Sequence, residues 1–327
     1  DWVWLKERSN TEGHFLQDSV RGASKVMFSN LNNAEVDSLT DYSDGGLNGF
    51  ISDGFTIGSG HAGNSNNINT NSETYVAWNW KAGGSASSNS DGTITSSVSA
   101  STTAGFSIVS YTSNGSASQT VGHGLGAVPQ MIIAKNRDST GSSYNYWTVY
   151  HHSLATANDK KLKLNETEAA TTTNLWGDAD PTTTKFYVHT SGDGSTNVST
   201  DKIIAYCFTG IKGYSKFGSY TGNGNADGTF VYTGFKPAWV MYKRSSASGN
   251  DWVMVDNKRD PINVCDEELY ANLNAAAGDV DLLDFTSNGF KCRRTHNSQN
   301  ASGSTYIYMA FAENPFVTST GIPTTAR

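Results

Sequence analysis

The feature that most constrains this chain of 327 residues is an internal repeat. Three segments each begin with a short apolar run that ends in a lysine, at Lys6, Lys135 and Lys243. Each segment continues through a polar loop and an aromatic-led run, and it closes on aromatic and β-branched residues: TYVAWNW, KIIAYCF and TYIYMAF. Because the three segments have similar lengths and the same internal order, the repeat predicts three structural units of one kind.

A second repeated feature precedes two of the three segments. Residues 106–137 and 216–244 each contain Ser-Tyr-Thr, a Gly-rich turn and a proline that opens the next apolar run, at Pro129 and Pro237. No such segment stands before Trp2. We therefore expect the first unit to be truncated on its N-terminal side, with its missing partner strands supplied by preceding sequence or by another chain.

Short runs of β-branched and aromatic residues, separated by Gly, Asn and Asp, predict the fold class. They indicate an all-β chain of tandem β-sandwich-like units, and the turns FISDGF and FTSNGF match each other in the first and third units. Asp-Gly and Asn-Gly favour tight turns because both residues tolerate positive φ. Helix is expected only as one short segment per unit, and the candidate segments are residues 30–40, 165–176 and 265–278.

The repeat also predicts the domain boundaries. Residues 83–105 are rich in Ser and Gly and contain no aromatic residue, which is typical of a flexible linker, although the weak alternation in TITSSVSAST also fits an edge strand. The short join TGIKGYSK predicts that the second and third units pack closely, with the first more independent. The predicted parts are unit 1 (1–82), the linker or edge strand (83–105), unit 2 (106–213), unit 3 (214–316) and a C-terminal tail (317–327).

The composition argues against several classes of partner. A net charge of −7 and a pI near 5.5 speak against nucleic acid, because phosphate binding needs a surplus of Lys and Arg. No apolar run reaches the length of about 18 to 20 residues that a membrane span needs, so we expect no membrane insertion. The cysteines Cys207, Cys265 and Cys292 form no CxxC pair, so we expect buried free thiols and folding in a reducing cytoplasm.

No catalytic signature is present in the sequence. HExxH, GxSxG and a phosphate-binding loop are absent, and GHGLGAVP lies between two predicted strands, where a tight turn explains its glycines. The acidic clusters GDADP, SGDGS and GDVDLLD match no calcium-binding spacing, and turns explain them best. We therefore predict a protein that is not an enzyme, with no catalytic residue, no metal site and no cofactor. A carboxylate pair joined only by folding is the route to a polysaccharide depolymerase that the sequence leaves open.

Exposed aromatic and histidine side chains are the best candidates for a binding surface. Tyr and Trp give a large contact area at a small entropy cost, and they suit sugars or protein partners. Most aromatic residues lie in closing runs and are expected in the core, as is Trp147, which matches Trp252. The ligand-binding candidates are Tyr144, Tyr146, His151, His152, Tyr220 and Tyr232.

Two further polar patterns have structural explanations. His151 and His152 are adjacent on a predicted strand, so their side chains point to opposite faces and cannot share one metal ion. The lysine that ends each first run, with the arginine that follows it, is expected to cap a strand end or to pair with Asp18 and Asp256.

Several segments carry a resemblance to a known group of proteins. FGSYTGNGNADGTFVYTGFKPAWVMYKR, DFTSNGFK, STYIYMAFAENPF and GIPTTAR resemble a repeated β-rich domain of virion structural proteins of tailed bacteriophages, especially marine ones. The resemblance covers nearly the whole chain, and unit 2 departs most because it lacks the Phe-x-x-[Asp/Asn]-Gly-Phe turn. It implies a component of the virion surface, such as a tail fibre or a capsid fibre, that folds in the cytoplasm of the host bacterium.

The resemblance and the repeat together predict a function. We expect a non-enzymatic, adhesin-like protein that attaches to the host envelope through a glycan or a protein receptor and contacts other virion proteins. Repeated weak sites and a homo-oligomer, with a trimer as one form, would add avidity. The alternative is a decoration or cement protein of the capsid or tail with a purely structural role, and a polysaccharide depolymerase is less favoured.

Overall fold

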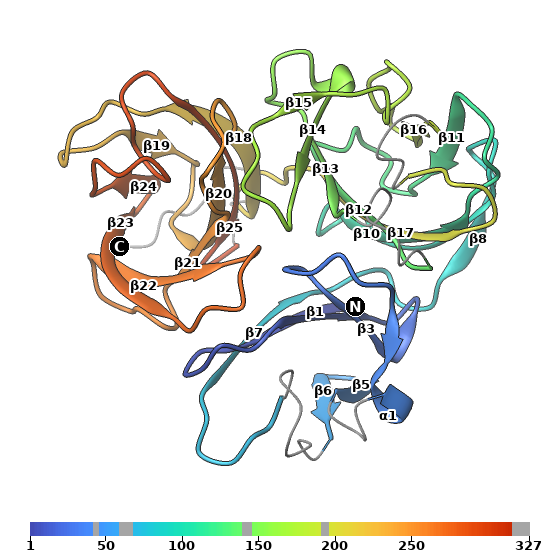
Figure 1. Cartoon of the computed structure of the whole chain (residues 1–327), viewed down its shortest axis with the longest axis horizontal. Helices are drawn as coiled ribbons and strands as arrows, with labels where there is room; N and C mark the ends of the chain where they lie inside the picture. Colours follow the sequence, from blue (N-terminus) through green and yellow to red (C-terminus); the bar gives the residue numbers. More distant parts are fainter. Residues whose placement is uncertain (42–45, 59–67, 139–145, 191–195, 316–327) are drawn as a thin grey trace.

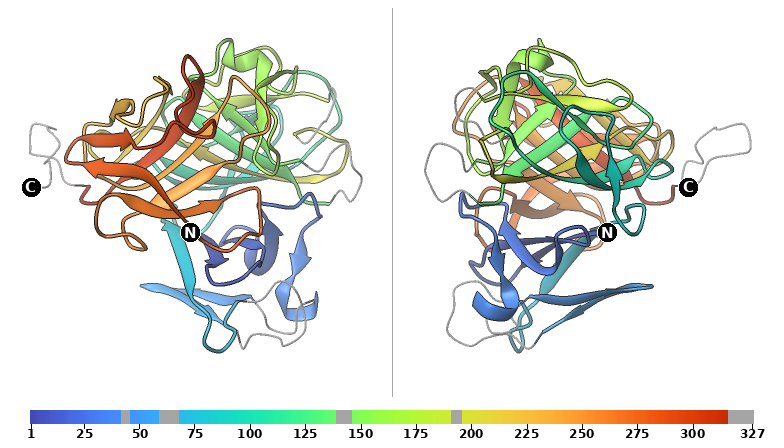
Figure 2. Two further views of the ribbon diagram at one scale, coloured as in Figure 1. Left: turned by 60° about the vertical axis from the view of Figure 1, so that its left-hand side comes forward. Right: turned by 90° about the vertical axis from the view of Figure 1, so that its right-hand side faces the viewer.

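The computed structural model describes residues 1–41, 46–58, 68–138, 146–190 and 196–315. Within these residues the chain is all-β, as the sequence predicts, with 25 strands and one four-residue α-helix, α1 (Ser38–Asp41). No helix in this part of the chain has the length and apolar character needed to cross a membrane. The three repeated segments form three lobes around a common centre (Figure 1), and unit 1 lies beneath both other units in Figure 2.

Unit 1 contains a five-stranded antiparallel sheet and a separate hairpin. Its strands are β1 (Trp2–Glu7), β2 (His14–Asp18), β3 (Gly22–Phe28), β4 (Val36–Asp37), β5 (Leu47–Ile51), β6 (Gly54–Ile57) and β7 (Tyr75–Trp80). The sheet order is β4-β3-β2-β1-β7, and the β5-β6 hairpin stands below this sheet in Figure 1. All six residues of β1 are buried, which explains why its sequence reads as an apolar run rather than an alternation.

Unit 2 contains an eight-stranded sheet and a two-stranded sheet. The preceding segment supplies β8 (Ser87–Asn89) and β9 (Ser96–Ser101), and the unit itself supplies β10 (Phe106–Thr112), β11 (Gln119–Gly122), β12 (Met131–Asn136), β13 (Thr148–His151), β14 (Lys160–Lys163), β15 (Thr171–Thr172), β16 (Lys185–Val188) and β17 (Lys202–Phe208). The order of the large sheet is β15-β14-β13-β12-β17-β10-β9-β8, and β11 pairs with β16. A short 3-10 helix spans Ala157–Asp159.

Unit 3 forms one curled, eight-stranded sheet. Its strands are β18 (Ser215–Thr221), β19 (Phe230–Tyr232), β20 (Pro237–Arg244), β21 (Val253–Asp256), β22 (Cys265–Tyr270), β23 (Gly278–Thr286), β24 (Gly289–Cys292) and β25 (Thr305–Ala312). The order is β18-β25-β20-β21-β22-β23-β24-β19. The two end strands, β18 and β19, are consecutive in the chain, so the sheet curls into a nearly closed barrel.

All three units share one frame. The first strand of each unit pairs antiparallel with the second strand and with the closing strand: β1 with β2 and β7, β12 with β13 and β17, β20 with β21 and β25. The registers agree, since Trp2 faces Trp80, Met131 faces Phe208 and Trp239 faces Phe311. Residues that occupy the same place in this frame are called equivalent below.

The units close into a ring because each one contacts both of the others. Three equivalent backbone hydrogen bonds join a loop amide of one unit to the carbonyl after the first strand of the next: Glu35 to Arg137 (2.8 Å), Ala170 to Ser245 (2.9 Å) and Ala277 to Arg8 (2.8 Å). The third bond returns to unit 1, so the arrangement has pseudo-threefold symmetry. Unit 1 is therefore as closely tied to its neighbours as units 2 and 3 are to each other, contrary to the sequence-based expectation.

An aromatic cluster fills the centre of the ring. The equivalent residues Trp80, Phe208 and Phe311 contact one another, with ring centres 5.7 to 6.5 Å apart. One hydrophobic cluster of buried residues runs through all three units and includes these side chains. Burial of this area supplies most of the driving force that holds the units together.

The three repeated lysines are buried and cap loop carbonyls at the strand ends. The Lys243 ammonium donates to the carbonyl of Asn250 at 2.7 Å and to that of Thr167 in unit 2 at 3.2 Å. The equivalent Lys135 donates to the carbonyl of Asn32 in unit 1 at 3.3 Å. Burial lowers the pKa of Lys243 to about 8 and that of Lys135 to about 7. Lys135 and Lys243 therefore serve the joints between units, whereas Lys6 donates to the carbonyl of Asn10 within unit 1.

Local structure differs from the sequence-based expectation in two places. Residues 265–278 were expected to form a helix, but their first six residues form β22, because they pair with β21 and β23. Residues 165–176 hold only the short strand β15 and loops, and the helix expected at 30–40 is limited to α1. In the segment 83–105, β8 and β9 form the outer edge of the sheet of unit 2. The tail 317–327 lies outside the described residues.

Candidate functional site

The structure separates the predicted binding residues into different environments. Tyr144 lies outside the described residues. Tyr146 is half-buried, with the Lys163 ammonium 3.7 Å from its ring centre. Tyr220 is only 7% exposed, stacks on Tyr306 and donates its hydroxyl to a backbone carbonyl, so it is a core residue. The expectation that Tyr220 is exposed is therefore wrong, because its face of β18 points into the barrel.

The two histidines differ in burial, but not by pointing to opposite faces of a strand as expected, because His152 follows the end of β13 and the two ring centres are 5.3 Å apart. His151 is fully buried, and its Nε2 lies 3.1 Å from the carbonyl of Tyr308 in unit 3. Burial lowers the pKa of His151 to about 3, so the ring is neutral at ordinary pH. The neutral ring contacts unit 3 through the Tyr308 carbonyl. His152 is exposed, and its Nε2 lies 3.1 Å from the carbonyl of Phe217. Of the two, His152 is the one available to a ligand.

His152 and Tyr232 meet at one groove, which is the candidate site. The groove has a volume of about 510 Å³ and lies between units 2 and 3, and we call it the inter-unit groove. Its lining residues are Gln130, His152, Gly210, Lys212, Gly213, Ser215, Lys216, Phe217, Tyr232, Thr233, Gly234 and Phe235. This volume falls within the range of about 300 to 1,000 Å³ that is typical of small-molecule sites.

Hydrogen bonds within unit 2 and at its join to unit 3 fix the floor of the groove. The His152 amide donates to the carbonyl of Gln130 at 2.9 Å, and the Gln130 side chain accepts from the Gly210 amide at 2.9 Å. The Ser215 hydroxyl accepts from the amide of Ile211 at 3.0 Å. The turn between β17 and β18 is thereby held against the start of β12, so the groove is formed before any ligand arrives.

One wall of the groove carries an exposed aromatic ring. Tyr232, at the end of β19, is 59% exposed, and the Lys216 ammonium lies 5.2 Å from its ring centre. Lys216 also donates to the Tyr232 carbonyl at 2.7 Å, and its partial burial lowers its pKa. Gly234 has φ +89°, and a Cβ at this position would lie 3.5 Å from the Tyr232 hydroxyl. The positive φ therefore favours glycine at this turn, whereas a Cβ would make only an ordinary contact with the ring.

The charge of the groove is opposite to that of the chain. None of the twelve described residues that line it is acidic, whereas Lys212 and Lys216 are basic. The formal charge of the whole chain is −7. Sequence reasoning missed Gln130 and both lysines, although the join TGIKGYSK, with two lysines and two glycines between two units, marked this position.

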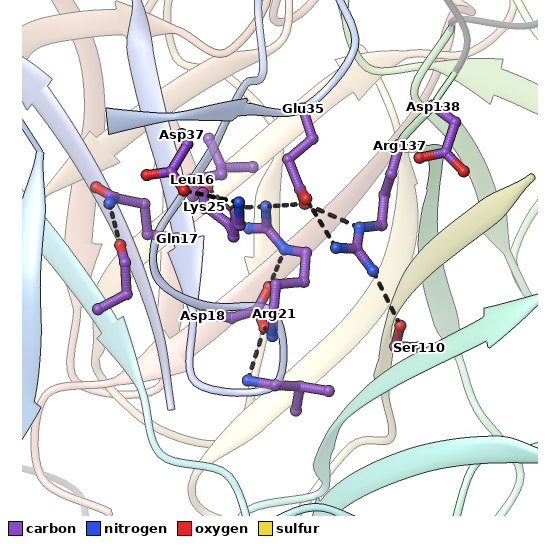
Figure 3. A network of polar contacts seen from close by, with 12 residues as sticks. Leu16, Gln17, Asp18, Arg21, Lys25, Glu35, Asp37, Ser110, Arg137 and Asp138 are labelled. Carbon is purple, nitrogen blue, oxygen red and sulfur yellow. Dashed lines mark hydrogen bonds and ion pairs between the residues drawn. The ribbon is translucent and has the colours of Figure 1, made fainter. Parts of the chain in front are cut away.

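A second polar cluster lies between units 1 and 2 and has a structural role (Figure 3). Arg21 pairs with Asp18 and, at 3.0 Å, with Glu35, and Glu35 also accepts from Arg137 of unit 2 at 2.7 Å. Burial alone would lower the pKa of Arg21, and the charges of Asp18, Tyr206 and Glu35 raise it on balance. Of the two roles expected for the lysine and arginine after the first strand, pairing with Asp18 is therefore wrong, because Asp18 pairs with Arg21 instead.

The carboxylate pair Asp260 and Asp266 adjoins only a small cavity. Asp266 lies beside Asp260, which raises the pKa of Asp266 to about 6 through a hydrogen bond and like charge. The adjoining cavity, lined by Asp260, has a volume of about 60 Å³, far below the size of a saccharide site. Among the residues that the structure describes, no three His, Cys, Asp or Glu side chains gather as a metal site would require.

Comparisons with known proteins give one result. A family model, described as a domain of unknown function (DUF7483), matches residues 1–315. No curated protein and no solved structure matches the chain. Since the match runs through all three units, the domain that defines the family is the complete ring rather than a single unit. The chain belongs to the family DUF7483.

Proposed function

We propose that this domain is a non-enzymatic binding module of a phage virion surface, and that it attaches to host-envelope glycans through the inter-unit groove. The observation that carries the proposal is the exposed ring of Tyr232 at the wall of a preformed groove. The resemblance to virion proteins of tailed phages supports the biological setting. Several copies of a weak site on one particle would provide avidity.

The chemistry of the groove suits a sugar that carries negative charge. The face of Tyr232 offers an apolar platform for a sugar ring, with its hydroxyl free to stay in contact with water. Gln130, His152 and Thr233 supply donors and acceptors around it, and Lys212 and Lys216 supply positive charge. We infer that carboxylate- or phosphate-bearing glycans bind more tightly than neutral ones.

Titration calorimetry with acidic and neutral host polysaccharides tests the proposal. Tyr232→Ala should weaken binding of an acidic polysaccharide by at least tenfold, since an aromatic anchor contributes about 2 kcal/mol at a binding hot spot. Phe230→Ala is the matched control, because Phe230 lies on the same strand, is 47% exposed and does not line the groove. Equal loss in both variants, or no binding to any host polysaccharide, would contradict the proposal.

Two further measurements separate the alternatives. Incubation with the same polysaccharides should release no oligosaccharide, and release would favour a depolymerase. Imaging of the particle distinguishes attachment from decoration: density at the tips of tails or fibres supports attachment, whereas density spread over capsid facets supports a structural role.

A further inference from the structure

Unit 1 has a free sheet edge at the position where units 2 and 3 have a paired one. The closing strands β17 and β25 each lie between two neighbours, and the outer neighbours are β10 and β18. The equivalent strand β7 is the end strand of its sheet among the described residues. The outer neighbours β10 and β18 begin the two-strand segments β10-β11 and β18-β19, whose second strands pair with β16 and β24, and the described residues of unit 1 contain no such segment.

The backbone of β7 presents hydrogen-bonding groups at this edge. The Arg8 amide donates to the Thr74 carbonyl at 2.8 Å, as the Arg137 amide does to that of Lys202 in unit 2. Because bonding direction alternates along an antiparallel strand, Ala77 and the residues two positions either side of it face away from β1. The side-chain amide of Asn79 donates to the Ala77 carbonyl at 3.3 Å, so this edge carbonyl has a partner within its own strand.

The closing strand of unit 1, β7, is also less buried than the closing strand of unit 2, β17. Asn79 is exposed and Ala77 is half-buried. Their equivalents in unit 2, Cys207 and Ala205, are both 0% exposed beneath β10. The surface of β7 therefore has the exposure of a strand whose outer neighbour has been removed.

A repeated side-chain trio shows what the neighbour supplies. In unit 3, Tyr220 of β18 lies 6.0 Å from Phe290, ring centre to ring centre, and Val231 of β19 pairs with Phe290 in register. In unit 2, the trio is Tyr111, Val121 and Phe186, with the Tyr–Phe ring centres 6.3 Å apart. Both equivalent phenylalanines, Phe186 and Phe290, are 0% exposed.

Unit 1 has the phenylalanine of this trio without the other two members. Phe55 occupies the place of Phe290, since FISDGF matches FTSNGF, and it is half-buried. Next to it, Ile51 is 51% exposed. A cavity of about 440 Å³ opens between β7 and the β5-β6 hairpin, and its lining includes Phe50, Phe55 and Asn79.

We propose that this cavity and the free edges of β7 and β6 form a docking slot for one two-strand segment of the β18-β19 kind, and we call it the two-strand slot. The occupant has a first strand that pairs with β7 and places a tyrosine on Phe55, and a return strand that pairs with β6 through a valine. This is strand addition to an exposed sheet edge, with main-chain bonds for affinity and side-chain pockets for specificity. A second copy that paired through β7 alone would leave Phe55 and β6 uncovered, so a two-strand segment fits the slot better.

The chain itself offers the probe. Residues 214–237 contain the two-strand segment β18-β19 and end on Pro237, whose frame position falls directly before Asp1. A fusion of this segment ahead of Asp1 should fill the slot of the full-length protein. Hydrogen exchange at residues 75–80 should slow by at least tenfold, and Tm should rise by more than about 2 °C for a stabilisation of this kind.

Two controls make the result decisive. The same fusion with Tyr220→Ser and Val231→Ser in the added segment should leave exchange at residues 75–80 unchanged. Ala77→Pro should remove the effect of the intact fusion, because proline has no amide to donate and is tolerated at an edge. Equal exchange with both fusions would overturn the proposal.

A measurement without fusion covers the case in which the fusion protein fails to fold. A synthetic peptide of residues 214–237, added to the full-length chain, should bind saturably at one per chain, and Ala77→Pro should abolish binding. Absence of binding at millimolar peptide would overturn the proposal. Protection of residues 75–80 that rises with protein concentration alone would also overturn it, because the slot would then hold a second copy.

Discussion

At the residue scale, the repeat shows how a buried ion pair is replaced without leaving a charge alone. Asp18 with Arg21, and Asp256 with Arg259, form the same buried pair in units 1 and 3. Unit 2 has His151 and Leu154 at these two places. The acid and the base have changed together, because either charge alone would be buried without a partner.

Removing one member of such a pair should be costly. Asp256→Asn leaves the Arg259 guanidinium buried without its carboxylate, and we expect a loss of about 3 to 5 kcal/mol in the free energy of unfolding. Urea denaturation measures this loss. Lys25→Gln, which breaks an exposed pair with Asp37, is the control and should cost less than about 1 kcal/mol. Equal losses in the two variants would contradict this account of the buried pair.

His151 should make stability depend on pH. Its pKa is about 3 in the folded protein, against an ordinary value of 6.5. As pH falls from 6.5 towards 3, the unfolded chain takes up a proton that the folded chain refuses, so stability is lost by about 1.4 kcal/mol per pH unit for this group. Chemical denaturation at pH 7, 6 and 5 measures the free energy of unfolding at each pH. This free energy should depend less steeply on pH in His151→Gln than in the exposed control His296→Gln.

At the scale of elements, the sequence predicts the first and closing strands well, but it does not predict which strands pair or which face of a strand is buried. The first and closing strands are recognisable because burial on both faces gives them continuous apolar runs. Residues 265–278 look helical because Glu, Leu and Ala favour helix, yet pairing with two neighbouring strands overrides that preference. Tyr220 was misplaced for a related reason: the alternation of β18 does not reveal which face meets the barrel.

Indole hydrogen bonds join strands of adjacent units. The Trp252 Nε1 donates to the Lys163 carbonyl of unit 2 at 2.8 Å, and Trp147 donates to the Phe28 carbonyl of unit 1 at the same distance. Trp252→Phe should cost about 0.5 to 1.5 kcal/mol, because it removes one buried hydrogen bond and leaves the Lys163 carbonyl with the longer bond from the Glu166 amide at 3.4 Å. Trp239→Phe is the matched control, since the buried Nε1 of Trp239 has no partner within the described residues. Thermal unfolding of both variants measures the difference, and a larger loss for Trp239→Phe would contradict the assignment.

At the scale of the whole molecule, the ring is the feature that the sequence hides most completely. Its joints use backbone amides and carbonyls, such as those of Glu35 and Arg137, which every residue possesses and no sequence pattern marks. The inter-unit groove forms only when units 2 and 3 pack together, so Gln130, Lys212 and Lys216 could not be assigned to the candidate site from the sequence. Tyr232 and His152 were accessible to prediction because exposed aromatic and histidine side chains stand out from a polar loop.

The aromatic centre should hold all three units at once. Phe208→Ala removes a fully buried ring that contacts Trp80 of unit 1 and Phe311 of unit 3. We expect the free energy of unfolding to fall by about 3 to 5 kcal/mol. This destabilisation should affect all three units and not unit 2 alone. Tryptophan fluorescence and circular dichroism during urea denaturation should report one midpoint, and a separate early transition would contradict a shared core.

Native-state hydrogen exchange, read by mass spectrometry, tests the ring most directly. If the three units form one cooperative body, the slowest amides of β1, β12 and β20 should exchange with the same opening free energy, and Phe208→Ala should lower all three by the same amount. The contradicting result is a β1 that opens at a lower free energy than β12 and β20 and does not respond to Phe208→Ala. Unit 1 would then be an independent domain, and the ring would not be the folding unit of this protein.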